Sequence, residues 1–323
     1  MADRFNAAAV PFGMKDKLGY MFGDFGNDFT FILSSSFMRM TDRFLAYTKR
    51  SDFLVCVDSD GCAMDTMDIK HISCFGPCMV EEWGLEKWGS EILKRWNEIN
   101  LYTMTRGINR YKGLSMALSE INEKYKRIKD IDILRKWAEK SQELSDRALE
   151  QEIMRNNSTC LKKALSWSMK VNQSIDRLKQ DEKRPFEGVA EALSVAHRDA
   201  DVAIVSSANL GAVLEEWELY GLLEQTDIVL AQDAGSKAFC IGELMKRGYA
   251  PEHVLMCGDA PGDMDAAEKN GVLYYPILVR HEKKSWEEFI REAFPKFIGS
   301  AYAGTYQKEK KRQFLKNLGN DHI

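Results

Sequence analysis

Short apolar runs that end in a polar residue recur along this chain. Phe53–Val57 is apolar throughout and stops at Asp58, and the run Val202–Val205 stops at Ser206. Short apolar runs bounded by polar or turn residues predict buried strands. Three further runs of this kind lie at 228–231, 254–257 and 272–278. Helical patterns separate these later runs, so we expect an α/β fold in which a parallel sheet carries helices on both faces.

A long segment of helical periodicity separates the first two runs. It covers about 120 residues and shows no convincing strand after Val80. Apolar residues recur there at helical spacing, at Leu85, Trp88, Ile92, Leu93 and Trp96, and again at Leu114, Leu118, Ile121 and Tyr125. We therefore predict an all-α insertion at 68–185. The α/β core is then formed by 51–67 and 186–323, after an N-terminal extension at 1–50.

Two carboxylates stand one residue apart at the end of the first predicted strand. Asp58 and Asp60 are followed directly by Gly61, which allows the backbone to turn away. Two carboxylates this close repel each other unless a cation neutralises them. Carboxylate oxygens are hard ligands that suit Mg²⁺. Because ligands bind parallel sheets beyond the carboxyl ends of the strands, the pattern predicts a metal-assisted site there.

The first motif resembles that of the haloacid dehalogenase superfamily. In that family a hydrophobic strand ends in Asp-x-Asp-Gly, and a further acidic residue follows. The resemblance implies that Asp58 is the nucleophile, Asp60 the general acid/base and Asp65 the later acidic position. Cys62 departs from the Thr or Val that the family most often has. Taken alone, such an acidic turn also occurs as a solvated strand end or a calcium-type loop.

Three later segments follow in the order that the superfamily uses. Ser206 ends a strand, with Ser207 as the alternative by register, and Lys237 opens a helical pattern. The segment from Val254 to Ala267 combines a strand, Gly-Asp, three residues and a second Asp, and it resembles the fourth motif. A hydroxyl or amide near Ser206 can bond a phosphoryl oxygen. Ser and Asn at that point are also typical of a helix N-cap, and the two roles are compatible.

The resemblance implies a Rossmann-like core, a Mg²⁺ cofactor and a set of site residues. The implied catalytic residues are Asp58, Asp60, Ser206 and Lys237. The implied metal ligands are Asp58, Asp60, Asp259 and Asp263. Implied contacts to the substrate come from Gly61, Ser207 and Asn209. Asp263 could bind metal directly, bind it through water, or hold Lys237, whereas Asp265 could simply favour the start of its helix.

The helical insertion resembles the cap of this superfamily, which closes over the first motif and selects the substrate. Its segment 105–113 interrupts the helical periodicity with two glycines and three basic residues. A flexible basic loop can recognise a second anionic group on a substrate, and Arg106 and Arg110 are the residues that we predict for this role. The alternative is an ordinary solvated turn between helices.

Composition narrows the possible partners and the compartment. A net charge of −4 gives no global attraction to nucleic acid or to an anionic membrane. Seven cysteines without a Cys-x-x-Cys pair suggest reduced thiols in a cytoplasmic protein. Asp24 and Asp28 interrupt the apolar stretch 18–40, so we expect a short helix or adapter there rather than a membrane span, and membrane contact is disfavoured.

The expected function is that of a Mg²⁺-dependent phosphohydrolase, which cleaves a small phosphorylated metabolite through an aspartyl phosphate. Asp60 argues against a dehalogenase, because a departing halide needs no proton. A phosphomutase of the same superfamily remains an alternative, as does a non-catalytic or membrane-associated binding protein. The sequence indicates neither the substrate nor the oligomeric state.

Overall fold

The computed structural model describes residues 40–319 of the chain. By its internal contacts the chain divides into two units, Met1–Arg43 and Phe44–Ile323. Most of the apolar stretch 18–40, predicted to be a short helix or adapter, lies outside the described residues. Within residues 40–319, no helix combines the length and the apolar character that crossing a membrane requires.

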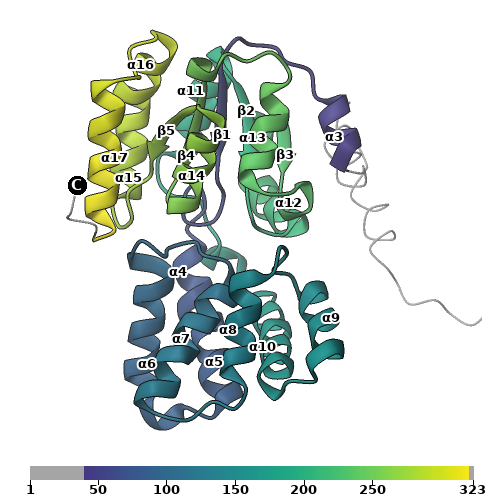
Figure 1. Ribbon diagram of the computed structural model, residues 1–323. Helices are drawn as coiled ribbons and strands as arrows, with labels where there is room; N and C mark the ends of the chain where they lie inside the picture. The colour runs from purple at the N-terminus through teal and green to yellow at the C-terminus, as the bar shows by residue number, and fades with distance from the viewer. Residues whose placement is uncertain (1–39, 320–323) are drawn as a thin grey trace, which may run out of the picture. The chain divides into compact units, whose positions relative to one another are not determined.

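A five-stranded parallel sheet forms the centre of the larger unit (Figure 1). Its strands are β1 (Leu54–Val57), β2 (Asp201–Val205), β3 (Ile228–Leu230), β4 (Val254–Gly258) and β5 (Leu273–Pro276). Their order is β3-β2-β1-β4-β5, and every pairing is parallel. β1 is central, with Cys56 paired to Ala203 of β2 and to Met256 of β4. The predicted α/β class is therefore confirmed.

Helices alternate with the strands after β1 and pack around the sheet (Figure 1). They are α11 (Val189–Asp199), α12 (Leu210–Leu219), α13 (Lys237–Met245), α14 (Pro261–Asn270), α15 (Glu282–Glu288), α16 (Phe294–Ile298) and α17 (Thr305–Asn317). The short helix α3 (Met40–Ala46) precedes β1. All strand positions except Val229 are buried, as expected for a parallel sheet that is covered on both faces.

Between β1 and α11 the chain forms a series of helices. They are α4 (Met67–Lys70), α5 (Gly76–Trp83), α6 (Gly89–Asn97), α7 (Arg110–Lys124), α8 (Ile131–Lys140), α9 (Asp146–Asn156) and α10 (Thr159–Ile175). Trp96 and Trp167 are fully buried in its hydrophobic core, with ring centroids 6.0 Å apart in an edge-on arrangement. The tryptophans at these helical positions thus pack the interior of the insertion.

The insertion joins the core through two neighbouring chain segments. The Phe186 amide donates to the carbonyl of Ala63, and the Asp65 amide donates to the carbonyl of Arg184. These bonds hold the outgoing and returning chains together just after the first motif. Residues 44–50, which the sequence placed in the N-terminal extension, belong to the larger unit, where the amide of Arg50 donates to Asp201.

Candidate active site

The first motif forms a tight loop at the carboxyl end of the central strand β1. Asp58 is buried, and its Oδ1 accepts a hydrogen bond from the Ser59 amide at 2.8 Å. Two buried indoles hold the loop: Trp217 donates to the Ser59 hydroxyl at 2.9 Å, and Trp286 donates to the carbonyl of Cys62 at 3.0 Å. Because β1 is central and the loop is anchored on both sides, the Asp58 carboxylate has a fixed position.

Three buried carboxylates meet at this point. One oxygen of each of Asp58, Asp259 and Asp263 lies within 4.8 Å of the others. Asp259 follows β4, and Asp263 lies in the first turn of α14, where its Oδ2 accepts from the Ala260 amide at 3.0 Å. Burial raises the pKa of both Asp58 and Asp259 to about 6, since a charged carboxylate is poorly solvated there.

Lys237 provides a cation to this cluster from the first position of α13. Its Nζ lies 2.6 Å from Asp58 Oδ2 and 2.5 Å from Asp263 Oδ1. Burial alone would lower the pKa of the lysine, but the two carboxylates outweigh burial and raise the pKa above its ordinary value. The ammonium therefore stays charged. The structure brings together the predicted residues of the first, third and fourth motifs, which lie up to 205 positions apart in sequence.

The donor set suits a divalent cation such as Mg²⁺. Asp259 is fully buried, yet its Oδ1 has no hydrogen-bond partner among the residues that the structure describes. A buried, unpaired carboxylate oxygen is costly, and a bound cation would satisfy it. Three carboxylates supply only hard oxygen atoms, the ligand type that Mg²⁺ prefers. Asp58, Asp259 and Asp263 are thus the side chains that fit the cation.

Asp60 is not part of that cluster of carboxylates. Its Oδ1 accepts from Thr66 Oγ1 at 2.5 Å and from Lys70 Nζ at 2.8 Å, whereas the sequence assigned its side chain to the metal as well. Lys70 also lies 3.3 Å from Glu216 of α12. Burial would raise the pKa of Asp60, but the charge of Lys70 and these hydrogen bonds lower the pKa below its ordinary value. Asp60 is therefore ionised in this arrangement.

The second motif places one hydroxyl near the strand end and uses its other polar residues locally. Ser206 directly follows β2 and is buried, and its Oγ accepts from the Ala208 amide at 3.2 Å. Asn209 is the N-cap of α12, with Oδ1 accepting from the Gly211 amide at 2.9 Å. Ser207 is exposed. The helix-capping interpretation of this segment is thus observed for Asn209, and Ser206 is the hydroxyl at the sheet edge.

The two arginines predicted for substrate recognition have different surroundings. Arg106 reaches the core, where its Nε lies 2.7 Å from Asp259 Oδ2, and both side chains are almost fully buried. Arg110 instead donates to Ser168 at 3.0 Å and to Asn172 at 2.8 Å, both on α10 of the insertion. The structure therefore places Arg106 at the carboxylate cluster and Arg110 against the insertion's own helix.

Part of the chain matches a known protein family, over a segment that includes Lys237, Asp259 and Asp263 but not Asp58. Residues 131–275 match the sequence model of the haloacid dehalogenase-like hydrolases. Over this segment the chain is similar to the haloacid dehalogenase-like hydrolases. No curated protein matches the chain.

Two solved haloacid dehalogenase-like or hydrolase structures illustrate the similarity. A haloacid dehalogenase-like family hydrolase from Streptococcus pneumoniae is 13% identical with a TM-score of 0.43, over 74% of this chain and 91% of that one. A hydrolase from Pseudomonas syringae is 14% identical with a TM-score of 0.43, over 73% of this chain and 90% of that one. Since both scores lie below 0.5, the similarity to this superfamily rests on the family match and on the motif residues.

Gly61 of the first motif has no room for a side chain. Its φ is +82°, and an added Cβ would lie 2.6 Å from both Arg106 Nη2 and Asp259 Oδ2. A left-handed backbone costs a non-glycine residue roughly 1–2 kcal/mol, and the contacts add to this cost. We expect Gly61→Ala to lower the free energy of unfolding by at least about 2 kcal/mol, as measured by urea denaturation.

Gly262→Ala is the matched control for this substitution. Gly262 lies in the first turn of α14, and an added Cβ would meet no atom within 4 Å. Alanine is the better helix former, so the variant should be unchanged or more stable by up to about 1 kcal/mol. Equal losses of stability in the two variants would mean that Gly61 is not restricted in this way.

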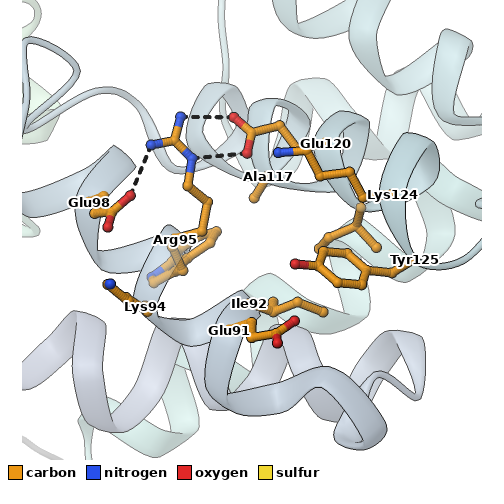
Figure 2. A pocket seen from close by; sticks show the side chains of 11 residues that line it. Glu91, Ile92, Lys94, Arg95, Glu98, Ala117, Glu120, Lys124 and Tyr125 are labelled. Carbon is orange, nitrogen blue, oxygen red and sulfur yellow. Dashed lines mark hydrogen bonds and ion pairs between the residues drawn. The ribbon is translucent and has the colours of Figure 1, made fainter.

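A cavity of about 250 Å³ lies elsewhere in the insertion, lined by α6 and α7 (Figure 2). Arg95 lies at one end and pairs with Glu120 at 2.9 Å and with Glu98 at 3.1 Å. Ile92 and Tyr125 line the other end. None of the residues that line this cavity belongs to the carboxylate cluster or to the four motifs.

Proposed function

We propose that this protein is a Mg²⁺-dependent phosphohydrolase that cleaves a small phosphorylated metabolite through an aspartyl phosphate on Asp58. The observation that carries the proposal is the meeting of Asp58, Lys237, Asp259 and Asp263 at the carboxyl ends of β1 and β4. A nucleophilic carboxylate, a fixed ammonium and a site for a divalent cation are the groups that a phosphoryl transfer requires.

In the first step, Asp58 attacks phosphorus in line with the leaving group. The bond between phosphorus and the leaving oxygen breaks as the bond to the Asp58 carboxylate forms, and Asp60 gives its proton to the departing alkoxide. Lys237 lies 2.6 Å from the nucleophile and holds it in place while countering charge on the phosphoryl oxygens. Bound Mg²⁺ would supply further stabilisation of that charge and keep Asp58 ionised.

In the second step, Asp60 accepts a proton from water, which attacks phosphorus and releases the Asp58 carboxylate. The ionised state of Asp60 beside Lys70 is the state that this step needs. The first step needs a proton on Asp60 instead. Glu216 offers Lys70 a second carboxylate at 3.3 Å, so that the buried ammonium keeps a partner when Asp60 is neutral. The Lys70–Glu216 pair thus supports both protonation states.

The cysteines bear on the cellular compartment in which the reaction takes place. All seven cysteines lie within the described part of the chain and are free thiols, which supports a reducing compartment such as the cytoplasm.

Phosphate release from a panel of phosphorylated metabolites, with Mg²⁺ and with a chelator, tests the proposed function. Phosphate release that occurs with Mg²⁺ and stops with the chelator supports the proposed function. Failure to release phosphate from any of the esters argues against the proposed function.

Asp60→Asn tests the acid/base role directly. We expect the rate of the first step on an alkyl phosphate to fall by about 10²–10⁴-fold, because the alkoxide then departs without a proton. The first step on p-nitrophenyl phosphate should fall far less, since p-nitrophenolate is a stable anion. Rapid-quench measurement should show a burst of one p-nitrophenolate per protein followed by slow turnover. Equal losses on the two substrates would contradict the assignment.

A further inference from the structure

We propose that Arg106 and the divalent cation compete for Asp259, so that the arginine of the insertion keeps the metal site closed until metal displaces it. The inference rests on the proposed function, because it concerns the cation that the proposed reaction uses. Arg106 belongs to the loop between α6 and α7, and Asp259 belongs to the core, 153 positions later in the chain. Their contact therefore connects the insertion directly to the metal site.

The guanidinium of Arg106 is buried against one carboxylate of the cluster, Asp259. Its Nε is 2.7 Å from Asp259 Oδ2, and its side chain is 1% exposed. An atom placed at the Cβ position of Gly61 would be 2.6 Å from Arg106 Nη2 and 2.6 Å from Asp259 Oδ2. The guanidinium thus lies close to Gly61 of the first motif and pairs with Oδ2 of Asp259, whereas Oδ1 of the same carboxylate has no hydrogen-bond partner among the described residues. A cation held by Asp58, Asp263 and this Oδ1 of Asp259 would therefore be a neighbour of the guanidinium on one carboxylate.

Two positive groups in this space would repel each other strongly. A buried guanidinium and a divalent ion on one carboxylate are poorly screened by water, and their repulsion increases in a medium of low polarity. Asp259 also loses its counter-charge if Arg106 leaves without a replacement, which is costly for a fully buried carboxylate. Asp259 therefore needs one positive partner, and a second positive partner is disfavoured. Under this condition the divalent cation replaces Arg106 when it binds.

Arg106 is connected to the rest of its loop, and the loop lies against the core. Arg106 Nη1 donates to the carbonyl of Leu101 at 2.7 Å, which ties the side chain to its own loop. Gly107 has a φ of +69°, and an added Cβ there would lie 2.7 Å from the Cβ of Ala260. The segment 103–109 consequently lies against the residue that follows Asp259. Displacement of Arg106 by metal should release this segment from the core.

Metal affinity provides a test that does not depend on turnover. We would measure Mn²⁺ binding by electron paramagnetic resonance with the full chain, in the wild type, in Arg106→Gln and in Arg110→Gln. If the closed arrangement is favoured about ten to one without metal, it weakens apparent metal affinity about tenfold. Arg106→Gln should therefore bind Mn²⁺ about tenfold more tightly than the wild type. Arg110 lies in the same region but contacts α10, so Arg110→Gln should bind Mn²⁺ with the same affinity as the wild type.

Hydrogen exchange of the wild type gives a second readout that needs no variant. Mg²⁺ should speed amide exchange in a peptide covering 103–109, and in Arg106→Gln this exchange should already be fast and unresponsive to Mg²⁺. Equal or weaker Mn²⁺ binding by Arg106→Gln, or slower exchange of 103–109 when Mg²⁺ is added, would overturn the competition. Absence of Mn²⁺ binding in all three proteins would instead remove the metal from the proposed function and the inference with it.

Discussion

Asp58→Asn should lower phosphate release by roughly a millionfold, the scale on which an enzyme loses activity when its nucleophile is removed. The amide has nearly the shape of the carboxylate, but it cannot form the acyl phosphate. The variant should remain folded, because one of three crowded carboxylates is lost and Lys237 still pairs with Asp263 at 2.5 Å. Phosphate release and thermal unfolding followed by circular dichroism measure the two effects separately.

Asp265→Asn is the control for this experiment. Asp265 is exposed on α14, two positions after Asp263, and its substitution should leave activity and stability close to those of the wild type. Steady turnover by Asp58→Asn at more than a small fraction of the wild-type rate would reject Asp58 as the nucleophile. Unfolding of the variant would show only that the site supports the fold.

The pH dependence of stability provides a further comparison between Asp58→Asn and the wild type. In the metal-free protein the pKa of Asp58 is raised by burial to about 6, above the ordinary value of 3.8. As pH falls, the folded state therefore takes up this proton at a higher pH than the unfolded state does. Protonated Asp58 thus stabilises the folded state at low pH. This contribution is lost as pH rises through about 6. Asp58→Asn should show a smaller loss of stability over that interval.

The strand ends were the part of the site that the sequence could predict. A short apolar run followed by a carboxylate or hydroxyl is a local pattern, and it located Asp58, Ser206 and Asp259 at the edge of the sheet. Parallel pairing then brings such strand ends to one edge, whatever their separation along the chain. Lys237 had a weak signal by itself, because a lysine at a helix start is usually solvated. Its assignment depended on the order of the motifs.

The contacts between the insertion and the core had no comparable local signal. Arg106 and Arg110 lie four positions apart in one basic segment, yet only Arg106 contacts Asp259. The difference arises because Asn109 caps α7, so that Arg110 is the first helical residue and contacts α10, whereas Arg106 precedes the helix in an irregular loop. Periodicity does not predict which core residue such a loop contacts.

The pairing of Lys70 with Asp60 and Glu216 was missed for a related reason. Lys70 lies on α4 at the start of the insertion, and Glu216 lies on α12, in a different part of the sequence. Both side chains are buried, which is rare for Lys and Glu unless they are paired. A charged residue on the helix face that packs against the protein interior could have indicated this pairing. Which face packs against the interior is known only from the structure.

Lys237→Met should remove activity and also destabilise the metal-free protein by about 3–5 kcal/mol, the range for a buried ion pair that loses one partner. Asp58 and Asp263 both pair with this lysine, so its removal leaves two buried carboxylates without their cation. Urea denaturation in a chelator measures the loss. Lys246→Met is the control, because Lys246 follows the same helix but is 70% exposed and pairs with Glu243 at the surface.

Acid and metal should each offset the loss in Lys237→Met, because each supplies positive charge to the same carboxylates. Without Lys237, the pKa of Asp58 and that of Asp263 rise further, since the lysine charge is what lowers them in the wild type. The folded variant then takes up protons at higher pH than the unfolded chain, so its deficit should shrink as pH falls from 8 towards about 5. Mg²⁺ should stabilise the variant by mass action as it binds the folded state. A deficit independent of both pH and Mg²⁺ would mean that Lys237 stabilises the fold through packing rather than through its charge at the carboxylate cluster.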